Sequence, residues 1–373
     1  MSRTAVIDMP GKMRTRLGGR LSPAWVVSHR VRAGAFTLLE LLVACAVFLL
    51  LLVLLLSAIG QTSQLVGRST QSVTAFQEAR TAFELMTRSL SQATLNTYWD
   101  YRDAAGDYRT SANAGTFQPK SYGRNSDLHF LLGDAGSTPG AGYSSLPGTP
   151  GTGQAVFFQY PSGRTASATY RNLEQLLNAS GYFIQYGDRE ALPAPFPGSD
   201  PKYRFRLMQA RQVSESLEVF TARTGNAWIQ NLSLEALPIA DNIVYALIWP
   251  RKSPVNDPEG DDLTNLNVSG GFAFDSRPDS ASAALSPQPD NVHQLPPVLQ
   301  ITLVALDETT AARVCTSASP PSAVTGLFNG LFATPTQTQF DTDLQTLEQR
   351  MGTAGFGFRI FSTTIPLKEC KMQ

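Results

Sequence analysis

Cysteine, histidine and charged residues are scarce in this chain of 373 residues, which has three Cys, three His and only 16% charged residues. Its formal net charge is zero, so no overall basic field points to nucleic acid as a partner. The motifs of zinc proteases, serine hydrolases, dinucleotide-binding folds and P-loop proteins are all missing. The sequence therefore predicts that the chain is not an enzyme, has no cofactor and does not bind nucleic acid.

Three features bear on chemistry, and each has a structural alternative that we prefer. The histidines His29, His129 and His293 are expected to be structural or solvated. The acidic stretch Asp257–Asp262 has the clustered carboxylates that Ca²⁺ favours, but it does not match the EF-hand register, so we expect a solvated loop and no metal. The aromatic cluster Tyr98–Tyr101 offers rings for stacking on a sugar or a partner, although packing where a helix ends is the preferred interpretation.

The first 35 residues are strongly basic, although the whole chain is neutral. They contain one acidic residue, Asp8, and seven basic residues: Arg3, Lys12, Arg14, Arg16, Arg20, Arg30 and Arg32. The segment carries +6 (7 − 1), and the remainder of the neutral chain therefore carries −6. Such asymmetry is typical of a targeting segment and says little about the fold.

An apolar run follows directly, from Phe36 to Ile59, and Glu40 is its only charge. As a helix it would be roughly 36 Å long, enough to cross the core of a bilayer. A buried helix of a soluble protein is the first alternative, but such helices are rarely apolar on every face. A simple secretory signal is the second, but no A-x-A-like cleavage site follows the run. Because basic residues stay in the cytoplasm, we expect the chain after Gly60 to lie outside it.

Glu40 is the informative residue of this run. A carboxylate within lipid costs about 3 kcal/mol on insertion scales, so it needs a cationic partner, and the apolar run itself contains none. If the chain is cut before Phe36, the new α-amine is mostly charged, because its reference pKa is about 8. An amine on one subunit would then neutralise Glu40 of a neighbour. The alternative is a carboxylate that reaches the membrane surface from a position near the helix end.

The segment 34–41 (GAFTLLEL) resembles the prepilin cleavage and methylation motif of type IV pilins and type II secretion pseudopilins. In that family a membrane peptidase cuts before the Phe, the new amine is methylated, and a Glu at mature position five guides assembly. The resemblance implies cleavage between Ala35 and Phe36, methylation of Phe36 and an assembly role for Glu40. The family prefers Gly just before the cut, where this chain has Ala35.

The same resemblance implies partners and a location. The partners are a prepilin peptidase, other pilin or pseudopilin subunits that pack along the N-terminal helix, and the inner membrane. The location is a single pass of the inner membrane, with a cytoplasmic N-terminus and a C-terminal domain in the periplasm or beyond, or in a fibre.

Beyond the apolar run the pattern changes twice. Residues 61–96 contain no proline, and their apolar residues from Val73 onward recur three and four apart, which predicts an amphipathic helix. After residue 96, stretches rich in Val, Ile, Phe and Tyr predict strands. These are Asp127–Leu132, Ala155–Tyr160, Tyr182–Tyr186, Tyr203–Met208, Asn242–Trp249, Val298–Leu306 and Phe358–Ile365. Short helices are expected at Asn172–Ala179 and Asp341–Met351.

Long loops rich in Gly, Pro and Ser separate these strands. They are Ser137–Gly153, Ala191–Pro201, Asp275–Pro297 and Ser317–Thr338. The predicted fold class is therefore α+β and pilin-like, with a long N-terminal helix packed on a C-terminal antiparallel β-sheet domain. The expected divisions are a basic leader (1–35), a transmembrane assembly helix (36–60), an amphipathic helix (61–96) and an exported β-rich domain (97–373).

Two further resemblances are carried by other segments. The order of the late strands is similar to that of the larger minor pseudopilins of the J type. In those proteins a similar Leu-Pro-x-x-Val segment precedes a late strand, and here it is Leu295-Pro-Pro-Val298. Residues 76–101 (FQEARTAFELMTRSLSQATLNTYWDY), with the prepilin motif, more closely resemble the Verrucomicrobia (Verru_Chthon) cassette protein C group. That group is known by its motif and its gene cassettes, so the resemblance implies no function beyond that of the motif.

The cysteines fit export. Cys45 lies in the apolar run, and Cys315 and Cys370 are the pair in the exported part, where a disulfide is permitted. Type IV pilins often close a C-terminal loop in this way, so the resemblance makes a Cys315–Cys370 bond an expectation that spacing alone leaves open. The function expected is a minor pilin or pseudopilin subunit. The alternative is a membrane-anchored adhesion or ligand-binding module that uses the prepilin pathway for anchoring.

Overall fold

A computed structural model describes residues 37–135, 153–188, 202–220, 227–260, 272–277 and 288–370, with the backbone alone for residues 60–73. The predicted cleavage site at Ala35 and Phe36 lies outside these residues, as do the basic leader and most of two expected loops, Ser137–Gly153 and Ala191–Pro201. The chain falls into two units that meet between Thr62 and Ser63. The boundary lies within one helix, α1 (Leu38–Leu90), and each unit is described by itself.

The described part of the first unit is almost wholly helical. From Leu38 to Ile59, α1 has 22 residues that are long and apolar enough, by length and composition, to cross a membrane. None of these side chains is buried inside the protein, and Leu39, Phe48 and Leu55 are all exposed. A surface that is apolar on every side of a helix suits lipid better than water, because lipid leaves no apolar area in contact with water.

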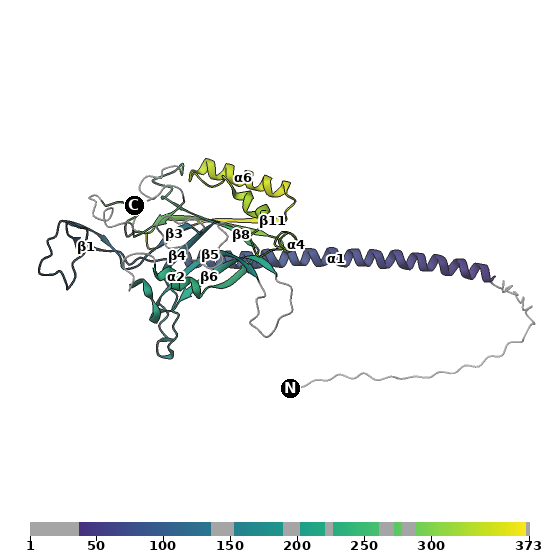
Figure 1. Ribbon diagram of the computed structural model, residues 1–373, viewed down its shortest axis with the longest axis horizontal. Coiled ribbons are helices and arrows are strands. Elements are labelled where there is room, and N and C mark those ends of the chain that lie inside the picture. The colour runs from purple at the N-terminus through teal and green to yellow at the C-terminus, as the bar shows by residue number, and fades with distance from the viewer. Residues whose placement is uncertain are drawn as a thin grey trace, which may run out of the picture. The chain divides into compact units, whose positions relative to one another are not determined.

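The second unit contains two antiparallel sheets and a separate hairpin (Figure 1). The larger sheet has the order β7-β6-β5-β4-β3-β9, and the smaller has the order β11-β10-β8. The strands of the larger sheet are β3 (Leu131–Asp134), β4 (Gln154–Pro161), β5 (Leu177–Asp188), β6 (Tyr203–Gln212), β7 (Leu237–Asp241) and β9 (Phe274–Asp275). Those of the smaller sheet are β8 (Ile243–Arg251), β10 (Val298–Leu306) and β11 (Phe358–Pro366), and β1 (Tyr98–Arg102) pairs with β2 (Ser121–Asn125) in the hairpin.

Asn242 lets the chain pass from the larger sheet to the smaller one. It separates β7 from β8 and has a φ of 63°, in the left-handed region that Asn tolerates better than most residues. Its amide donates to the Phe205 carbonyl over 2.6 Å, and its own carbonyl accepts from the Leu306 amide over 2.9 Å. The corner is thus hydrogen-bonded to a strand of each sheet, and β8 lies against β4, β5 and β6.

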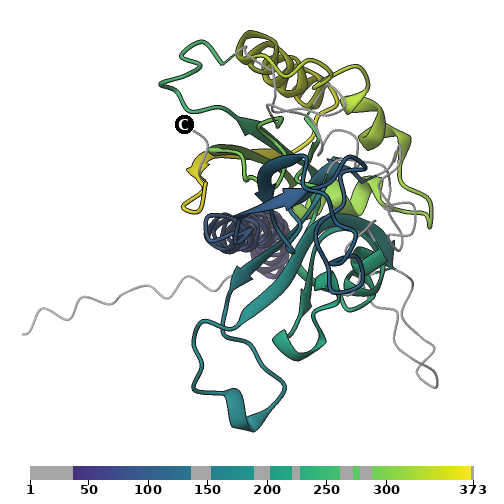
Figure 2. The ribbon, with the colours of Figure 1, turned by 90° about the vertical axis from the view of Figure 1, so that its left-hand side faces the viewer.

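The last turns of α1 pack into the core of the second unit. Ala79, Phe83, Met86 and Leu90 are buried at spacings of three and four, which is the amphipathic pattern that the sequence predicts. Phe83 meets Phe361 of β11 with ring centroids 5.9 Å apart. Ser89 is also hydrogen-bonded to Tyr182 of β5 over 2.8 Å. Within this unit, therefore, α1 touches both sheets, and Figure 2 shows its last turns end-on beside their strands.

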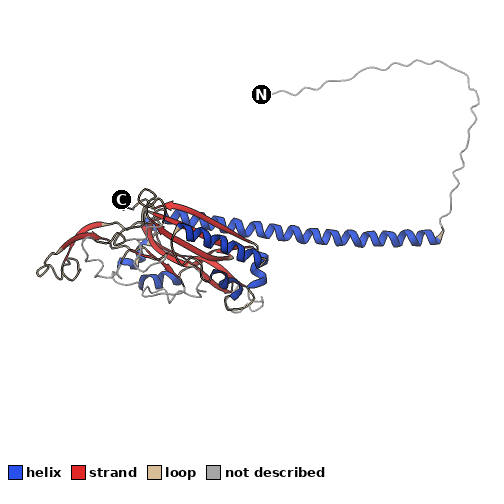
Figure 3. Ribbon diagram, turned by 90° about the horizontal axis from the view of Figure 1, so that it is seen from above, coloured by secondary structure: helices blue, strands red, loops and turns tan. Residues whose placement is uncertain are grey.

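Shorter helices complete the second unit (Figure 3). They are α2 (Ala227–Leu234), α4 (Glu308–Val314), α5 (Ser322–Thr325) and α6 (Gln337–Thr353), with 3-10 turns at Ala168–Tyr170, Ser214–Ser216, Glu218–Phe220 and Gly326–Phe328. Helix α4 starts where Asp307 accepts a hydrogen bond from the Thr310 amide over 2.7 Å, and α6 starts with Thr336 in the same role. Side-chain oxygens of this kind satisfy amides that a helix start leaves unbonded.

Several predictions of the sequence are wrong in detail. Helix α1 ends at Leu90 and not near Asn96, because the Thr94 amide donates to the Gln159 carbonyl of β4 over 2.9 Å and so forms an isolated antiparallel bridge with that strand. Residues 172–179 do not form a helix. Instead β5 begins at Leu177, since pairing with β4 and β6 outweighs the local helical pattern.

Candidate functional site

Glu40 lies in the first turn of α1, where it forms a reciprocal cap with Thr37. The Glu40 carboxylate oxygen Oε2 accepts hydrogen bonds from the Thr37 amide and the Thr37 hydroxyl, each over 3.1 Å. The Thr37 hydroxyl oxygen in turn accepts from the Glu40 amide over 3.3 Å. This is a capping box, in which two side chains satisfy amides at the helix start. The negative charge also lies at the end of the helix where the backbone dipole is positive.

The capping box leaves half of the Glu40 carboxylate open. Both bonds use Oε2, and within the described residues no hydrogen bond engages the second oxygen, Oε1. The sequence predicts a carboxylate without a cationic partner in its own span, and Thr37, which is neutral, adds hydrogen bonds but no positive charge. The signal was present as Thr37-x-x-Glu40, which is the pattern of a capping box before an apolar run.

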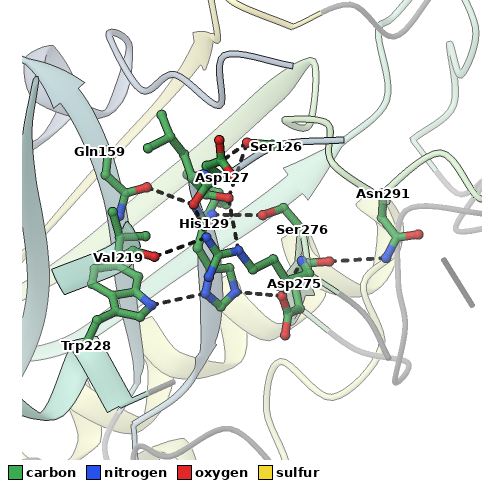
Figure 4. Close-up of polar contacts among 12 residues, drawn as sticks. Ser126, Asp127, His129, Gln159, Val219, Trp228, Asp275, Ser276 and Asn291 are labelled. Atoms are coloured by element: carbon green, nitrogen blue, oxygen red, sulfur yellow. Dashed lines mark hydrogen bonds and ion pairs between the residues drawn. The ribbon is translucent and has the colours of Figure 1, made fainter. Parts of the chain in front are cut away.

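His129 lies two residues before β3, at the centre of a buried polar network (Figure 4). The Trp228 indole nitrogen donates to His129 Nδ1 over 3.2 Å, and His129 Nε2 lies 2.8 Å from an oxygen of Asp275. Because an indole N–H can only donate, Nδ1 accepts, and the proton of the neutral ring is on Nε2 and points to Asp275. Burial lowers the pKa of His129, although Asp275 opposes that effect.

The hydrogen bonds of this network connect separate elements, and they leave neither nitrogen of the His129 ring free to transfer a proton to or from a substrate. A His–Asp pair can serve as a general base only if the second ring nitrogen faces a substrate, and here Trp228 occupies it. The neighbouring guanidinium of Arg277 donates to backbone carbonyls, including that of Leu128 over 3.2 Å. The arrangement therefore connects β9 and α2 to the segment before β3.

His293 is the second buried histidine. Its Nε2 lies 3.1 Å from the Tyr108 hydroxyl, and its Nδ1 has no hydrogen-bond partner. Burial lowers the pKa of His293 to about 3, with smaller contributions from cationic neighbours such as Arg102 and Arg277. The ring is therefore neutral at neutral pH. Of the three histidines, His29 lies outside the described residues.

Cys315 and Cys370 do not form the expected disulfide in this structure. Cys315 follows α4, beyond the C-terminal end of β10, whereas Cys370 follows β11 at the N-terminal end of β10. A nine-residue strand is roughly 26 Å long, but the Cα atoms of a disulfide lie within about 7 Å. The Cys370 thiol donates to the Leu295 carbonyl over 3.1 Å, and burial raises the pKa of Cys315 to about 11.

The acidic stretch Asp257–Asp262 is only partly described. Asp257 is buried and accepts a hydrogen bond from the Gly260 amide over 2.9 Å, so one of its oxygens closes a turn. Asp261 and Asp262 lie outside the described residues. In the part of the chain that the structure describes, no three side chains of His, Cys, Asp or Glu lie together in a way that would hold a metal ion.

The aromatic cluster after α1 is exposed, which corrects the prediction that it packs where the helix ends. Trp99 and Tyr101 of β1 are 58% and 53% exposed, and Tyr122 of β2 is 58% exposed. The ring centroids of Trp99 and Tyr122 are 5.5 Å apart, and those of Tyr101 and Tyr122 are 4.8 Å apart. The sequence locates the cluster but misses both strands, because they send few apolar side chains into the core.

A shallow depression of about 260 Å³ lies between α1 and β7. Glu78 of α1 and Asp241 of β7 are at its wall, where the Asp241 amide donates to Glu78 Oε1 over 3.3 Å. The depression is smaller than typical pockets for small molecules, which start at about 300 Å³. The hydrogen bond between Glu78 and Asp241 occupies one backbone amide of β7, which is an edge strand of the larger sheet. Unpaired edge strands can otherwise pair with other chains.

Comparisons with known proteins add no relative. No protein-family model, curated protein or solved structure matches this chain.

Proposed function

We propose that the chain is an exported, pilin-like subunit: a minor pilin or pseudopilin that is anchored by a single pass of α1 through the inner membrane. The observation that carries the proposal is α1 itself. One continuous helix of 53 residues begins with an exposed apolar stretch of membrane length and ends with turns that pack on antiparallel sheets. The prepilin-like motif at 34–41 supports it independently of the fold.

In this proposal the peptidase cuts between Ala35 and Phe36, and the new Phe36 amine is methylated. The basic segment 1–35 stays in the cytoplasm until the cut, and the β-rich unit lies on the other side of the membrane. Thr37 remains on the mature chain, so the capping box survives processing. The open oxygen of Glu40 then accepts the charged amine of a neighbouring subunit. At an effective dielectric constant of 20 and a separation of 4 Å, that attraction is worth about 4 kcal/mol.

The experiment separates the charge of Glu40 from its role as a cap. Glu40→Gln removes the charge, but a Gln at this position still completes a capping box. Thr37→Ala keeps the charge and removes the cap, at a cost of about 1 kcal/mol in helix stability. The amount of each variant in sheared surface fibres is compared with its amount in membranes.

We expect Glu40→Gln to insert into the membrane but to be lost from fibres, and Thr37→Ala to be retained in them. The opposite result would mean that the cap matters and the charge does not. Equal incorporation of wild type and Glu40→Gln would contradict pairing and favour the second candidate function.

That second candidate is a membrane-anchored binding module that uses the prepilin pathway for anchoring alone. The exposed hairpin rings of Trp99, Tyr101 and Tyr122 favour it, because a subunit that only fills a fibre has no use for them. The two functions are compatible, since a minor subunit at a fibre tip can also bind a ligand.

A further inference from the structure

The outer face of the β1–β2 hairpin is an aromatic platform, which we define as Trp99, Tyr101 and Tyr122. Tyr101 pairs directly with Tyr122 across the two strands, and Trp99 is two residues from Tyr101, so all three side chains lie on the same face. Each is more than half exposed. No hydrogen bond within the described residues engages the indole N–H or either phenol hydroxyl. The platform thus presents three rings with unused polar groups at their rims.

Contacts on both faces hold the hairpin in place: Asn125 and Arg102 lie on the opposite face, whereas Arg124 pairs directly with Trp99 and lies on the platform's own face. The Asn125 side-chain amide donates to the Tyr98 hydroxyl over 2.8 Å. Arg102 is buried, and its guanidinium carbon lies 4.2 Å from the centre of the Tyr108 ring. The Arg124 guanidinium donates to the backbone carbonyls of residues 289 and 292 over 2.5 and 3.2 Å. Because the backbone is anchored by these contacts, the platform is ordered before any ligand arrives, which lowers the entropic cost of binding.

The size of the platform argues against a protein partner. A buried aromatic side chain contributes 150–250 Å², so three half-exposed rings offer roughly 250–400 Å². A stable protein interface needs about 800 Å² from each partner. The platform therefore matches a small flat ligand that covers two or three rings.

The charge of the hairpin argues against a charged ligand. Apart from the buried Arg102, residues 98–125 contain three acidic side chains and three basic ones, so their charges cancel (3 − 3 = 0). These are Asp100, Asp103, Asp107, Arg109, Lys120 and Arg124. A balanced surface does not attract nucleic acid or anionic lipid, both of which need a basic excess. A neutral ligand with one apolar face and hydroxyl groups at its rim fits the platform, and a sugar ring has this chemistry.

We propose that Trp99, Tyr101 and Tyr122 bind a neutral saccharide, with the sugar rings stacked on the aromatic faces and the hydroxyl groups bonded to the free Trp and Tyr polar groups. The site goes beyond the subunit role and does not depend on fibre assembly.

The test uses the full chain in detergent and gel electrophoresis through neutral polysaccharides: a β-glucan, a xylan, a galactomannan and a dextran. At least one polysaccharide should retard the wild type. Trp99→Ala and Tyr122→Ala should each weaken that retardation about tenfold, and Trp99→Phe, which keeps a ring, should weaken it less. Tyr170→Ala is the matched control, because Tyr170 is 46% exposed but lies in a 3-10 turn away from the hairpin. It should bind like the wild type.

A second measurement does not depend on whether the variants fold. Trp228 and Trp249 are buried, so in a Trp25→Phe background Trp99 is the exposed tryptophan. An oligosaccharide of the retarding polymer should protect it from quenching by iodide. Three results would overturn the proposal: no retardation by any of the polymers, equal losses in Tyr170→Ala and Trp99→Ala, or binding to lipid vesicles in place of polysaccharide.

Discussion

His293 makes the stability of the second unit depend on pH. The pKa of its ring is lowered to about 3 in the folded chain, mainly by burial, against about 6.5 in an unfolded one. Below pH 6.5 the unfolded chain binds a proton that the folded chain excludes. The stability contributed by the neutral ring is therefore complete above pH 6.5 and is lost as the pH falls towards 3. His129, with its lowered pKa, acts in the same direction.

We predict that replacing His293 flattens this dependence. His293→Asn suits the left-handed backbone at this position, where φ is 54°, and cannot titrate. The slope of the unfolding free energy between pH 6 and pH 4 should decrease by up to about 1.4 kcal/mol per pH unit. Urea unfolding at three pH values in this range measures this slope for the wild type and for the variant. The contribution of the carboxylates is the same in both proteins and cancels when the two slopes are subtracted. An unchanged slope would show that the buried ring does not control the dependence.

Cys315 should react slowly with alkylating reagents. Its thiol is buried, and its raised pKa of about 11 leaves little thiolate at pH 8. Cys370 is partly exposed and should be modified first by iodoacetamide in the folded chain, with Cys315 following only after unfolding. Peptide mass mapping follows the two sites separately. Equal rates, or a peptide pair linked by a disulfide, would contradict the arrangement in the structure.

Among the secondary-structure elements, strand β5 lies in a tightly packed part of the larger sheet. A Cβ atom added at Gly181 would overlap the ring of Phe157, which is fully buried against Phe183 and Trp228. Gly181→Ala should therefore destabilise the second unit by about 1–3 kcal/mol, the usual cost of overpacking. The control is Gly352→Ala in α6, where no atom lies within 4 Å of the added Cβ.

The two alanine variants should differ in the sign of their effect. Gly352→Ala should stabilise by up to about 1 kcal/mol, because Ala favours the helix. Thermal unfolding in detergent, followed by near-ultraviolet circular dichroism, measures both changes. If both variants shift the midpoint in the same direction, the packing around Phe157 is looser than the structure indicates.

The sequence predicts those elements whose apolar pattern also determines their burial. Strand β10 begins and ends at the predicted Val298 and Leu306, and α6 contains the whole of Asp341–Met351. Strands β1 and β2 were missed because their outer side chains are exposed aromatics. Strand β9 has only two residues and depends on pairing with β3, where Leu132 pairs with Phe274, 142 positions away (274 − 132), and Leu131 with Asp275, 144 positions away (275 − 131). Pairing between distant segments has no local signal.

The site was predictable to a similar degree. Glu40 stands out as the charge in an apolar run, but its capping box with Thr37, three residues earlier, is not among the predicted features. The expected Cys315–Cys370 disulfide is absent from the structure for a different reason: the two residues lie beyond opposite ends of β10, and the sequence carries no local signal of that separation. Exposure of the Trp99 platform also follows from the tertiary structure, because the same aromatic residues would suit a core.

In the molecule as a whole, α1 has two environments. Its first 22 residues expose apolar side chains on every face, and its last turns bury Phe83, Met86 and Leu90 in the β-rich unit. An anchored subunit needs both properties in one chain. In the proposed function, processing has to precede assembly, because the proposed pairing of Glu40 requires the amine that cleavage would create.

Mass analysis of the N-terminus of membrane-purified protein shows whether the chain is processed before Phe36. We predict a mature chain that begins with N-methylated Phe36 and retains α1, including Glu40. A chain that keeps residues 1–35, or one that is cut near Ser57–Gly60 and released from the membrane, would contradict the account.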